Sequence, residues 1–427
     1  MINFITKIEE VIWSVPLLLL LSFTHLFFTF KLKLPQKYTF KGLKLMFKPK
    51  VNSNGISSFK SLMTVLAATL GTGNIIGVAS AIVIGGVGSI FWIFVSGIFA
   101  IATKYAETYL VLKYRKREGD SYIGGTMYVL RERLGKKRLG ILFSIFLVIA
   151  SFGIGSMIQS NAMATSLTTT FNINKRLLAI LITIFCTYVI FGNERRISNV
   201  SSILVPIATI VYFAMCIILL YTFRYNILSS IILIIKEAFS LKSLSGGIVG
   251  IALIKALNAG LSKGLFSNEA GMGSSPLFNA TVEGEDIVKE SIIASSSVFI
   301  DTVFLCTLTG IVLVSSGLWN VTKDATIFTS SVFSTIAYGN YLLTFSLVIF
   351  AAATIPCWSY YGLIGIKYIF KDSKIAEFMY KGIYILCVYI GAILTLDVVW
   401  SISSIANALM VLPNIYMLFK LKDEIKI

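Results

Sequence analysis

Small and polar residues interrupt an otherwise apolar stretch between residues 57 and 84. The run Thr69-Leu70-Gly71-Thr72-Gly73-Asn74 lies near its middle. Glycine costs a helix about 1 kcal/mol relative to alanine, so this cluster indicates either close helix packing or local unwinding. Unwound backbone offers N–H groups to a carboxylate and carbonyl oxygens to a hard cation. Asn74 favours unwinding, because a lone amide in an apolar setting is costly unless it finds partners.

A second glycine-rich stretch covers residues 242 to 266. It opens with Gly246, Gly247 and Gly250 and closes with Gly260 and Gly264. A pair of glycine-broken apolar segments in corresponding halves of a chain is typical of proteins that bind a solute at the middle of a membrane. Gly250 is therefore included with Thr72, Gly73 and Asn74 among the candidate substrate contacts.

Three further residues have side chains suited to the same chemistry. Gln159, within SFGIGSMIQSN, either binds one end of an amino acid or makes a structural hydrogen bond between helices. Thr354 and Trp358 are one helical turn apart and share a helix face. The threonine hydroxyl can ligate a cation, and the indole can cover a small side chain.

Charged residues inside apolar segments are candidates for function by default. Asp301 fits a coupling-ion ligand, a proton carrier or a buried structural acid. Lys104 and Glu107 are one turn apart and can pair with each other. Asn268 and Glu269 follow the second glycine-rich stretch and are interpreted as a turn or a gate, not as a binding site.

The elements that must position these residues are membrane helices. Of 427 residues, 56% are hydrophobic and 13% charged, and the mean hydropathy is +0.85. A spanning helix needs about 20 mostly apolar residues. We therefore predict an all-α polytopic membrane protein with about eleven transmembrane helices. The predicted spans are residues 9–31, 57–84, 88–113, 139–168, 176–193, 198–224, 242–266, 288–318, 340–369, 378–397 and 399–420.

The distribution of basic residues predicts the topology. Residues 31–60 contain eight lysines and no acid, and residues 113–138 contain nine basic residues. Such loops stay cytoplasmic, which places the N-terminus outside and the C-terminus inside the plasma (inner) membrane. The expected units are an N-terminal helix with its basic loop, two five-helix repeats of inverted topology, an extracellular connection between them and a cytoplasmic tail. Their bounds are residues 1–56, 57–224, 225–241, 242–420 and 421–427.

Other functions find little support in the sequence. The net charge of +17 is dispersed among apolar segments, so no nucleic-acid partner is expected. The five cysteines all lie in apolar stretches without metal-ligand spacing. Phosphate-binding loops, paired zinc ligands and a nucleophile beside a histidine are not found, so we expect neither an enzyme nor a cofactor.

Several runs resemble the alanine/glycine:cation symporter family. They are TVLAATLGTGNIIGVASAI, FWIFVSGIFAIATKYAET, GGTMYVL, SFGIGSMIQSN, GLFSNEAGMGSSP, VFIDT and WSYYG, between residue 60 and about residue 365. The resemblance implies the fold of the bacterial leucine transporter with one extra N-terminal helix, and sodium-coupled uptake of a small neutral amino acid such as alanine or glycine. The chain departs from the family's pattern at Ser156 and Leu363, which leaves room for altered substrate size or coupling.

The resemblance also implies roles for individual residues. Thr72 and Gly73 would hold the substrate, Gln159 would contact its polar end and Trp358 would close the pocket. Sodium, the coupling ion, would lie between backbone oxygens near Ala67 and Leu70 and the Thr354 side chain. Two other hypotheses stay open, namely proton coupling, because Asp301 is intramembrane, and a sensor that binds small amino acids without transporting them.

Overall fold

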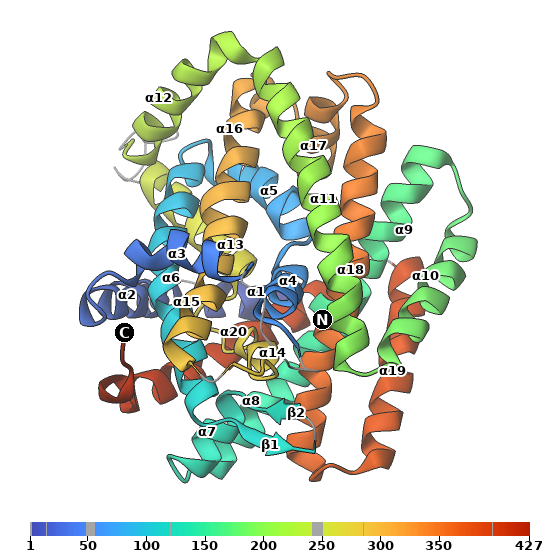
Figure 1. Ribbon diagram of the computed structural model, residues 1–427. Coiled ribbons are helices and arrows are strands. Elements are labelled where there is room, and N and C mark those ends of the chain that lie inside the picture. Colours follow the sequence, from blue (N-terminus) through green and yellow to red (C-terminus); the bar gives the residue numbers. More distant parts are fainter. Residues whose placement is uncertain are drawn as a thin grey trace.

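The computed structural model describes residues 2–13, 15–47, 56–119, 121–240, 251–284, 286–394 and 396–427. The chain is mainly helical, and long helices pack side by side around a common centre (Figure 1). Strands β1 (Lys116–Glu118) and β2 (Ser121–Ile123) form a small antiparallel hairpin with Arg117 opposite Tyr122.

Seven helical runs in the described part of the chain are long and apolar enough to cross a membrane, or eight if a bent pair at residues 16–45 is counted as one span. Each of the seven lies on a predicted span. They are α6 (Ser89–Lys113); α8 (Lys137–Ala150) with η3 (Ser151–Met157) and α9 (Ile158–Phe171); α11 (Glu194–Thr222); α15 (Ile287–Val298) with η5 (Phe299–Cys306) and α16 (Thr307–Ser315); α18 (Gly339–Phe370); α19 (Lys374–Ile393); and α20 (Asp397–Lys420). The elements η3 and η5 are π-helical.

The other predicted spans are shorter or interrupted. Residues 57–84 divide into α4 (Ser58–Thr69), η2 (Thr72–Asn74) and α5 (Ile76–Gly85). Residues 176–193 form α10 (Lys175–Ile190), and the second glycine-rich stretch contributes to α13 (Ile251–Asn268). The count of eleven spans therefore depends on including broken and short helices.

The predicted first span, residues 9–31, is wrong at its start. The chain forms two helices there, α1 (Ile2–Ile12) and α2 (Val15–Lys31). A turn at Trp13 follows α1, and Pro16, which lacks an N–H, lies at the second position of α2. Proline is tolerated in the first turn, where α2 begins.

Short helices connect the long ones. The predicted connection 225–241 contains α12 (Ile227–Ala238), which packs against α6 and α16. The others are η1 (Pro35–Tyr38), α3 (Thr39–Leu45), α7 (Thr126–Glu132), η4 (Arg224–Asn226), α14 (Pro276–Asn279), η6 (Leu318–Asn320), α17 (Ala325–Phe333) and η7 (Lys422–Glu424).

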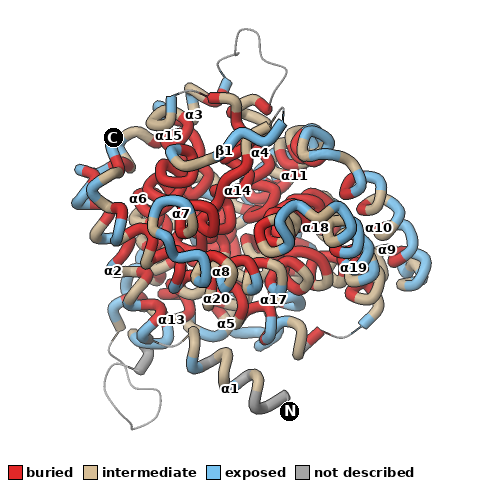
Figure 2. Tube along the Cα trace, turned by 90° about the horizontal axis from the view of Figure 1, so that it is seen from below, coloured by how far each residue is buried: buried red, intermediate tan, exposed pale blue. Residues whose placement is uncertain are grey.

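Buried residues fill the centre of the molecule and exposed ones its rim (Figure 2). Helix α18 is central and packs against α4, α8, α9, α11 and α19. Helices α10 and α19 lie at the periphery, where large apolar side chains such as Ile184, Phe378 and Leu386 are exposed. An apolar periphery of this kind suits contact with lipid, which is as apolar as leucine.

At the centre, four helices from the interrupted segments pack against one another in two pairs. Helix α5 packs against α13, and α4 packs against α14. Each pair brings together one piece of the first interrupted span and one piece from around residues 269–275, which follow α13 without regular helix. Irregular backbone at membrane depth is tolerated where protein buries it or where it lines a cavity.

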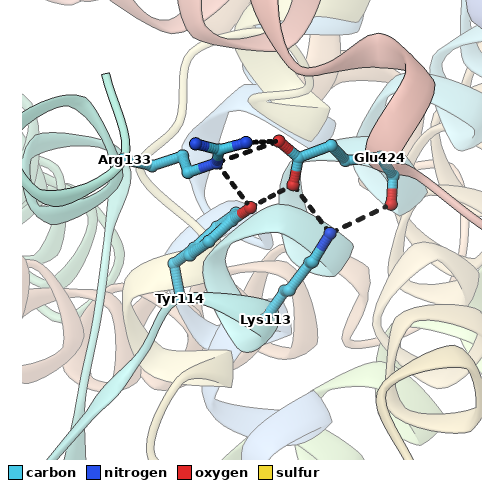
Figure 3. Close-up of polar contacts among 4 residues, drawn as sticks. All are labelled: Lys113, Tyr114, Arg133 and Glu424. Atoms are coloured by element: carbon cyan, nitrogen blue, oxygen red, sulfur yellow. Dashed lines mark hydrogen bonds and ion pairs between the residues drawn. The ribbon is translucent and has the colours of Figure 1, made fainter.

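The end of the chain is attached to the basic loops by an ion cluster around Glu424 (Figure 3). Lys113 Nζ lies 2.7 Å from Glu424 Oε2, and Arg133 Nη2 lies 2.9 Å from Oε1. Tyr114 donates its hydroxyl to the same carboxylate. Burial of the carboxylate raises its pKa, but the hydrogen bonds from Lys113, Tyr114 and Arg133 outweigh this and lower the pKa of Glu424 to about 2.

Candidate functional site

The helix formed by α4 stops at Thr69, as the glycine cluster predicts. Leu70 has extended backbone, with φ −75° and ψ 94°, and the short helix η2 follows before α5 begins. The Gly71 N–H is donated to Asn74 Oδ1 at 3.2 Å and not to a helical carbonyl. The backbone is therefore unwound across residues 70–75, which we call the first break.

Three oxygens meet at the end of α4. The Thr354 hydroxyl donates to the carbonyl of Ala67 at 2.7 Å and lies 3.4 Å from the carbonyl of Leu70. All three residues are buried. The carbonyl of Phe350, on the same helix as Thr354, also lies 2.9 Å from this hydroxyl. A hydroxyl has one proton, so Thr354 satisfies one of these three carbonyls at a time. Two backbone carbonyls and a hydroxyl are oxygen ligands of the kind that hard cations take.

Gln159 lies beside this group. Its Nε2 donates to the carbonyl of Ile154 at 3.3 Å, whereas its Oε1 is buried with no hydrogen-bond partner among the described residues. A methyl group placed on Gly71 would lie 3.4 Å from that Oε1 and 3.6 Å from Thr354 Oγ1. An unpaired buried acceptor costs about 1–3 kcal/mol. The Gln159 oxygen is therefore suited to a ligand that donates hydrogen bonds, such as an ammonium group.

Trp358 is almost completely buried one helical turn from Thr354. Its Nε1 donates to the carbonyl of Ala68 at 3.3 Å. A side chain at Gly155 would overlap Trp358 Cβ, so this glycine allows η3 to approach α18 closely. The indole thus packs between α4 and the π-helical segment η3 and restricts the space near the first break.

The side of the first break near Gly73 is more open. Gly73 and Gly77 are partly exposed, whereas Thr72 is buried. A methyl group on Gly73 would lie 3.8 Å from Phe266 Cδ1, and one on Gly77 would meet no described atom within 4 Å. Phe266 was not predicted from the sequence, because an aromatic residue in an apolar helix carries no specific signal.

Asn74 joins the first break to Asp301. Its Nδ2 donates to the Asp301 carboxylate and lies 3.0 Å from Ser267 Oγ. Ser267 and Thr302 also donate to Asp301 Oδ2, at 2.9 Å and 2.7 Å. Asp301 lies in the π-helical η5, in contact with the first break. This position suits a coupling residue, and its three donors also suit a structural acid.

The second glycine-rich stretch differs from its prediction. Gly260 and Gly264 lie within the uninterrupted helix α13, where methyl groups would lie 2.5 Å from Ser89 O and Ser96 Oγ. These glycines therefore allow close packing on α6 and do not unwind the helix. Gly246, Gly247 and Gly250 lie outside the described residues. Regular helix is lost after Asn268, across the fully buried residues 269–275, which we call the second break.

The second break begins in a tight turn. Asn268 Nδ2 donates to the carbonyl of Gly264 at 2.7 Å, and its Oδ1 accepts from the Ala270 N–H at 2.9 Å. Glu269 has positive φ, 53°, and its carboxylate accepts from Ser274 Oγ at 2.5 Å. These contacts agree with the interpretation of Asn268 and Glu269 as a turn. Their role as a gate stays a prediction.

Charged and amide side chains from neighbouring helices attach to the same segment. Lys104 Nζ donates to the carbonyl of Asn268 at 2.9 Å. Asn414 Nδ2 donates to the carbonyl of Gly271 at 2.9 Å and to Glu107 Oε1 at 2.6 Å. Lys104 and Glu107, one turn apart, thus make their hydrogen bonds with other residues and not with each other.

The fold and the paired breaks define a polytopic helical membrane protein with leucine-transporter-like architecture. A solved structure, that of MhsT in complex with L-phenylalanine, aligns with a TM-score of 0.61 at 15% identity, and the alignment covers 86% of this chain and 89% of that one. The model of the sodium:alanine symporter family matches residues 1–426, and the chain belongs to that family. It is therefore a transporter-family protein and not an enzyme.

Two relatives are similar over nearly the whole chain. The sodium/alanine symporter AgcS of Methanococcus maripaludis is 33% identical, over 97% of this chain and 93% of its own length. A protein of Haemophilus influenzae described as an uncharacterized transporter is 38% identical, over 99% of this chain and 94% of its own. The family resemblance predicted from the motifs is thus confirmed.

Proposed function

We propose that this protein carries a small neutral amino acid, of the size of alanine or glycine, into the cell together with sodium by alternating access. The observation that carries the proposal is the group of Thr354 Oγ1 with the carbonyls of Ala67 and Leu70, next to the unpaired amide oxygen of Gln159. One set of oxygens suits a cation, and the single acceptor suits an ammonium group. Both lie at the same break.

Each residue has a defined part in this proposal. Sodium binds between the Ala67 and Leu70 carbonyls and the Thr354 hydroxyl, which turns its oxygen lone pair toward the ion. The substrate carboxylate meets the backbone N–H groups of the first break at Thr72 and Gly73. Its ammonium group donates to Gln159 Oε1. Trp358 limits the side chain that fits.

Asn74 supports the site in another way. Both ends of its amide bind protein atoms, Gly71 N–H on one side and Asp301 on the other. It therefore holds the first break in its unwound form and joins it to η5. The sodium/alanine symporter AgcS, 33% identical, supports the assignment of substrate class and ion.

The proposed setting is the plasma membrane, with the lysine-rich loops facing the cytoplasm and the N-terminus outside. The five-helix repeats of residues 57–224 and 242–420 then rock against each other around the two breaks. This orientation follows from the two basic loops, residues 31–60 and 113–138, because lysine- and arginine-rich loops stay cytoplasmic.

Counterflow of labelled alanine in proteoliposomes tests the function. We expect exchange that needs sodium and is driven by an imposed sodium gradient. Uptake that persists unchanged without sodium would exclude the sodium mechanism. Binding without any exchange would identify a sensor instead.

Proton coupling is a second candidate, favoured by the intramembrane Asp301 and its contact with Asn74. Imposed sodium and proton gradients, applied separately, distinguish the two. Alanine accumulation driven by a proton gradient in sodium-free medium, and lost in Asp301→Asn, would favour this candidate.

A further inference from the structure

The chain turns sharply after α2, at a segment that we call the elbow (residues 31–47). The axes of residues 16–31 and 35–45 differ by 70°. Lys33 and Leu34 both have positive φ, 52° and 62°, and the Leu34 N–H donates to the carbonyl of Thr29 at 2.9 Å. Positive φ is uncommon in residues other than glycine, so the structure around this turn must hold it in place.

One face of α3 is held by the protein. Thr39, Gly42 and Met46 are buried, and α3 packs along α15. A methyl group on Gly42 would lie 2.7 Å from the carbonyl of Ile292, and Ser296 Oγ donates to the carbonyl of Thr39 at 3.2 Å. Figures 1 and 2 show α3 and α15 next to each other. The elbow is thus a docked element with a fixed orientation.

The remaining faces of the elbow are exposed and divided by chemistry. Phe40 and Phe47, seven residues apart, are 65% and 67% exposed and share one face. Next to that face lie exposed lysines of α3 and η1, and residues 31–47 contain no acidic residue. These lysines are Lys37, Lys41 and Lys44. Lys31 and Lys33, before η1, are exposed as well, and Lys31 pairs with Asp423.

We propose that the elbow is a binding surface for anionic phospholipid headgroups. A helix with lysines on one face and large apolar side chains on the adjoining one lies in the membrane interface. The Phe40 and Phe47 rings enter the acyl boundary, and the ammonium groups of Lys37, Lys41 and Lys44 meet the phosphates. Lysine clusters that directly follow a membrane helix bind anionic lipid in this way. A soluble phosphate would satisfy the lysines but not the rings.

The position of the elbow links the lipid to the first break. Helix α15, on which α3 packs, continues into η5, and η5 carries Asp301, which binds Asn74. Phe40 also contacts Phe299 of η5, with 5.4 Å between ring centroids. Lipid bound at the elbow therefore holds α15 and η5 in place and modulates transport. This second part rests on the proposed function, whereas the lipid surface does not.

The test measures lipid-induced thermal stabilisation of the purified full chain. Lys37, Lys41 and Lys44 are changed together to Gln. The matched control changes Lys136, Lys137 and Arg138 to Gln, which removes the same charge from another exposed site. Phosphatidylglycerol, phosphatidylcholine and soluble glycerol phosphate are titrated separately. Near-surface lysines contribute about fivefold each to anionic-lipid binding, so the triple variant should need about a hundredfold more phosphatidylglycerol.

Three results would overturn the proposal. The first is a phosphatidylglycerol titration of the triple variant that matches the wild type. The second is equal stabilisation by phosphatidylcholine. The third is full stabilisation by glycerol phosphate alone, which would indicate a site for free anions. Replacing the same lysines with Arg keeps the charge and should restore lipid binding, which separates loss of charge from misfolding. Changing Phe40 and Phe47 to Gln should weaken the thermal stabilisation by phosphatidylglycerol. The same change should leave any response to glycerol phosphate as it is.

Alanine uptake in vesicles of phosphatidylglycerol or phosphatidylcholine tests the coupling to transport. Faster uptake in phosphatidylglycerol, lost in the triple variant but not in the control, supports it, and equal uptake in both lipids refutes it. Because lipid binding is read by thermal shift, a failure of amino-acid transport would leave that result intact. The two proposals therefore fail separately.

Discussion

The two breaks have the same general character but differ in how their main-chain carbonyls are bound. Both contain glycine and both separate helices that pack in pairs, but Gly73 leaves the first break partly exposed, whereas the second is buried. In the first break, Thr354 has one proton for the carbonyls of Ala67, Leu70 and Phe350, and Gln159 Oε1 has no partner among the described residues. In the second, side chains from α6 and α20 bind the carbonyls of Asn268 and Gly271, and the unpaired atoms are Ser275 Oγ and Glu107 Oε2 at its edge.

This difference assigns different tasks to the two segments. Buried polar groups are normally matched, so an unmatched one needs an explanation such as a ligand that comes and goes. The first break has such groups at the position expected for an ion and an amino acid. The second break resembles a fixed joint, since removing a partner would leave a buried group unpaired. The comparison predicts that mutations in the first break change binding, and mutations in the second change stability.

The largest effect is expected at Gly271. This residue has φ +89°, and a methyl group there would lie 2.5 Å from Leu21 Cδ2. Gly271→Ala should lower the free energy of unfolding by about 3 kcal/mol, from backbone strain and steric overlap together. Thermal unfolding in detergent measures this loss.

Gly71→Ala is the matched change in the first break. Gly71 has φ −140°, which any residue adopts, and its methyl group would make ordinary contacts. We expect nearly unchanged stability but weaker amino-acid binding, because the methyl group enters the space between Gln159 and Thr354. Equal destabilisation by the two alanines would contradict the division of tasks.

The next-largest effect is expected at Thr354, in the proposed sodium site. Thr354→Val removes one oxygen ligand while keeping the shape of the side chain. A hydrogen bond or ligand to a charged group contributes about 2 kcal/mol, so half-maximal stimulation should need roughly thirtyfold more sodium. A sodium titration of alanine uptake measures this. Thr354→Ser keeps the hydroxyl and should stay near wild type, and an unchanged titration in the valine variant would remove Thr354 from the site.

A smaller effect is expected at Gln159. Gln159→Ala removes the unpaired acceptor, so alanine affinity should fall by about tenfold, which corresponds to one charged hydrogen bond of about 1.5 kcal/mol. Alanine binding by thermal shift, with sodium present, reads the affinity. Gln159→Glu retains an acceptor and serves as the control. Wild-type affinity in Gln159→Ala would show that the oxygen does not face the substrate.

The sequence predicts the first break well, because glycine and asparagine in an apolar run have a local physical cost. It also places Thr354 and Trp358 on one face, since a helical turn fixes that spacing. The meeting of Thr354 with Ala67 and Leu70, by contrast, joins residues almost 290 positions apart. It was implied by the family resemblance and could not be derived from local pattern.

Other features lack a local signal altogether. The π-helical segment η5 is mostly apolar like an ordinary membrane helix, and the serines and glycines of η3 equally suit close helix packing, so the sequence reveals neither. In the sequence, Gly260 and Gly264 could either unwind their own helix or allow a neighbouring helix to pack closely. Only the position of α6 shows that they allow close packing. The second break begins after the glycine-rich stretch, at Glu269, where its shape depends on Lys104 and Asn414 from distant helices.

The smallest effect is expected at Glu424, whose carboxylate is also bound by several side chains but lies near water. The pKa of Glu424 is lowered from 4.5 to about 2 by Lys113, Tyr114 and Arg133, against the effect of burial. Its charge therefore stabilises the fold above about pH 4.5, and this contribution is lost as the pH falls toward 2.

Glu424→Gln should cost about 1 kcal/mol or less at pH 7, because ion pairs near the surface are screened. The difference in unfolding temperature between variant and wild type should narrow as the pH is lowered from 5 to 3. Glu237→Gln, on the peripheral helix α12, removes the same charge as a control. If Glu424→Gln lowered the free energy of unfolding as much as Gly271→Ala, this would contradict the comparison. It would mean that attachment of the chain end, and not burial of the second break, dominates stability.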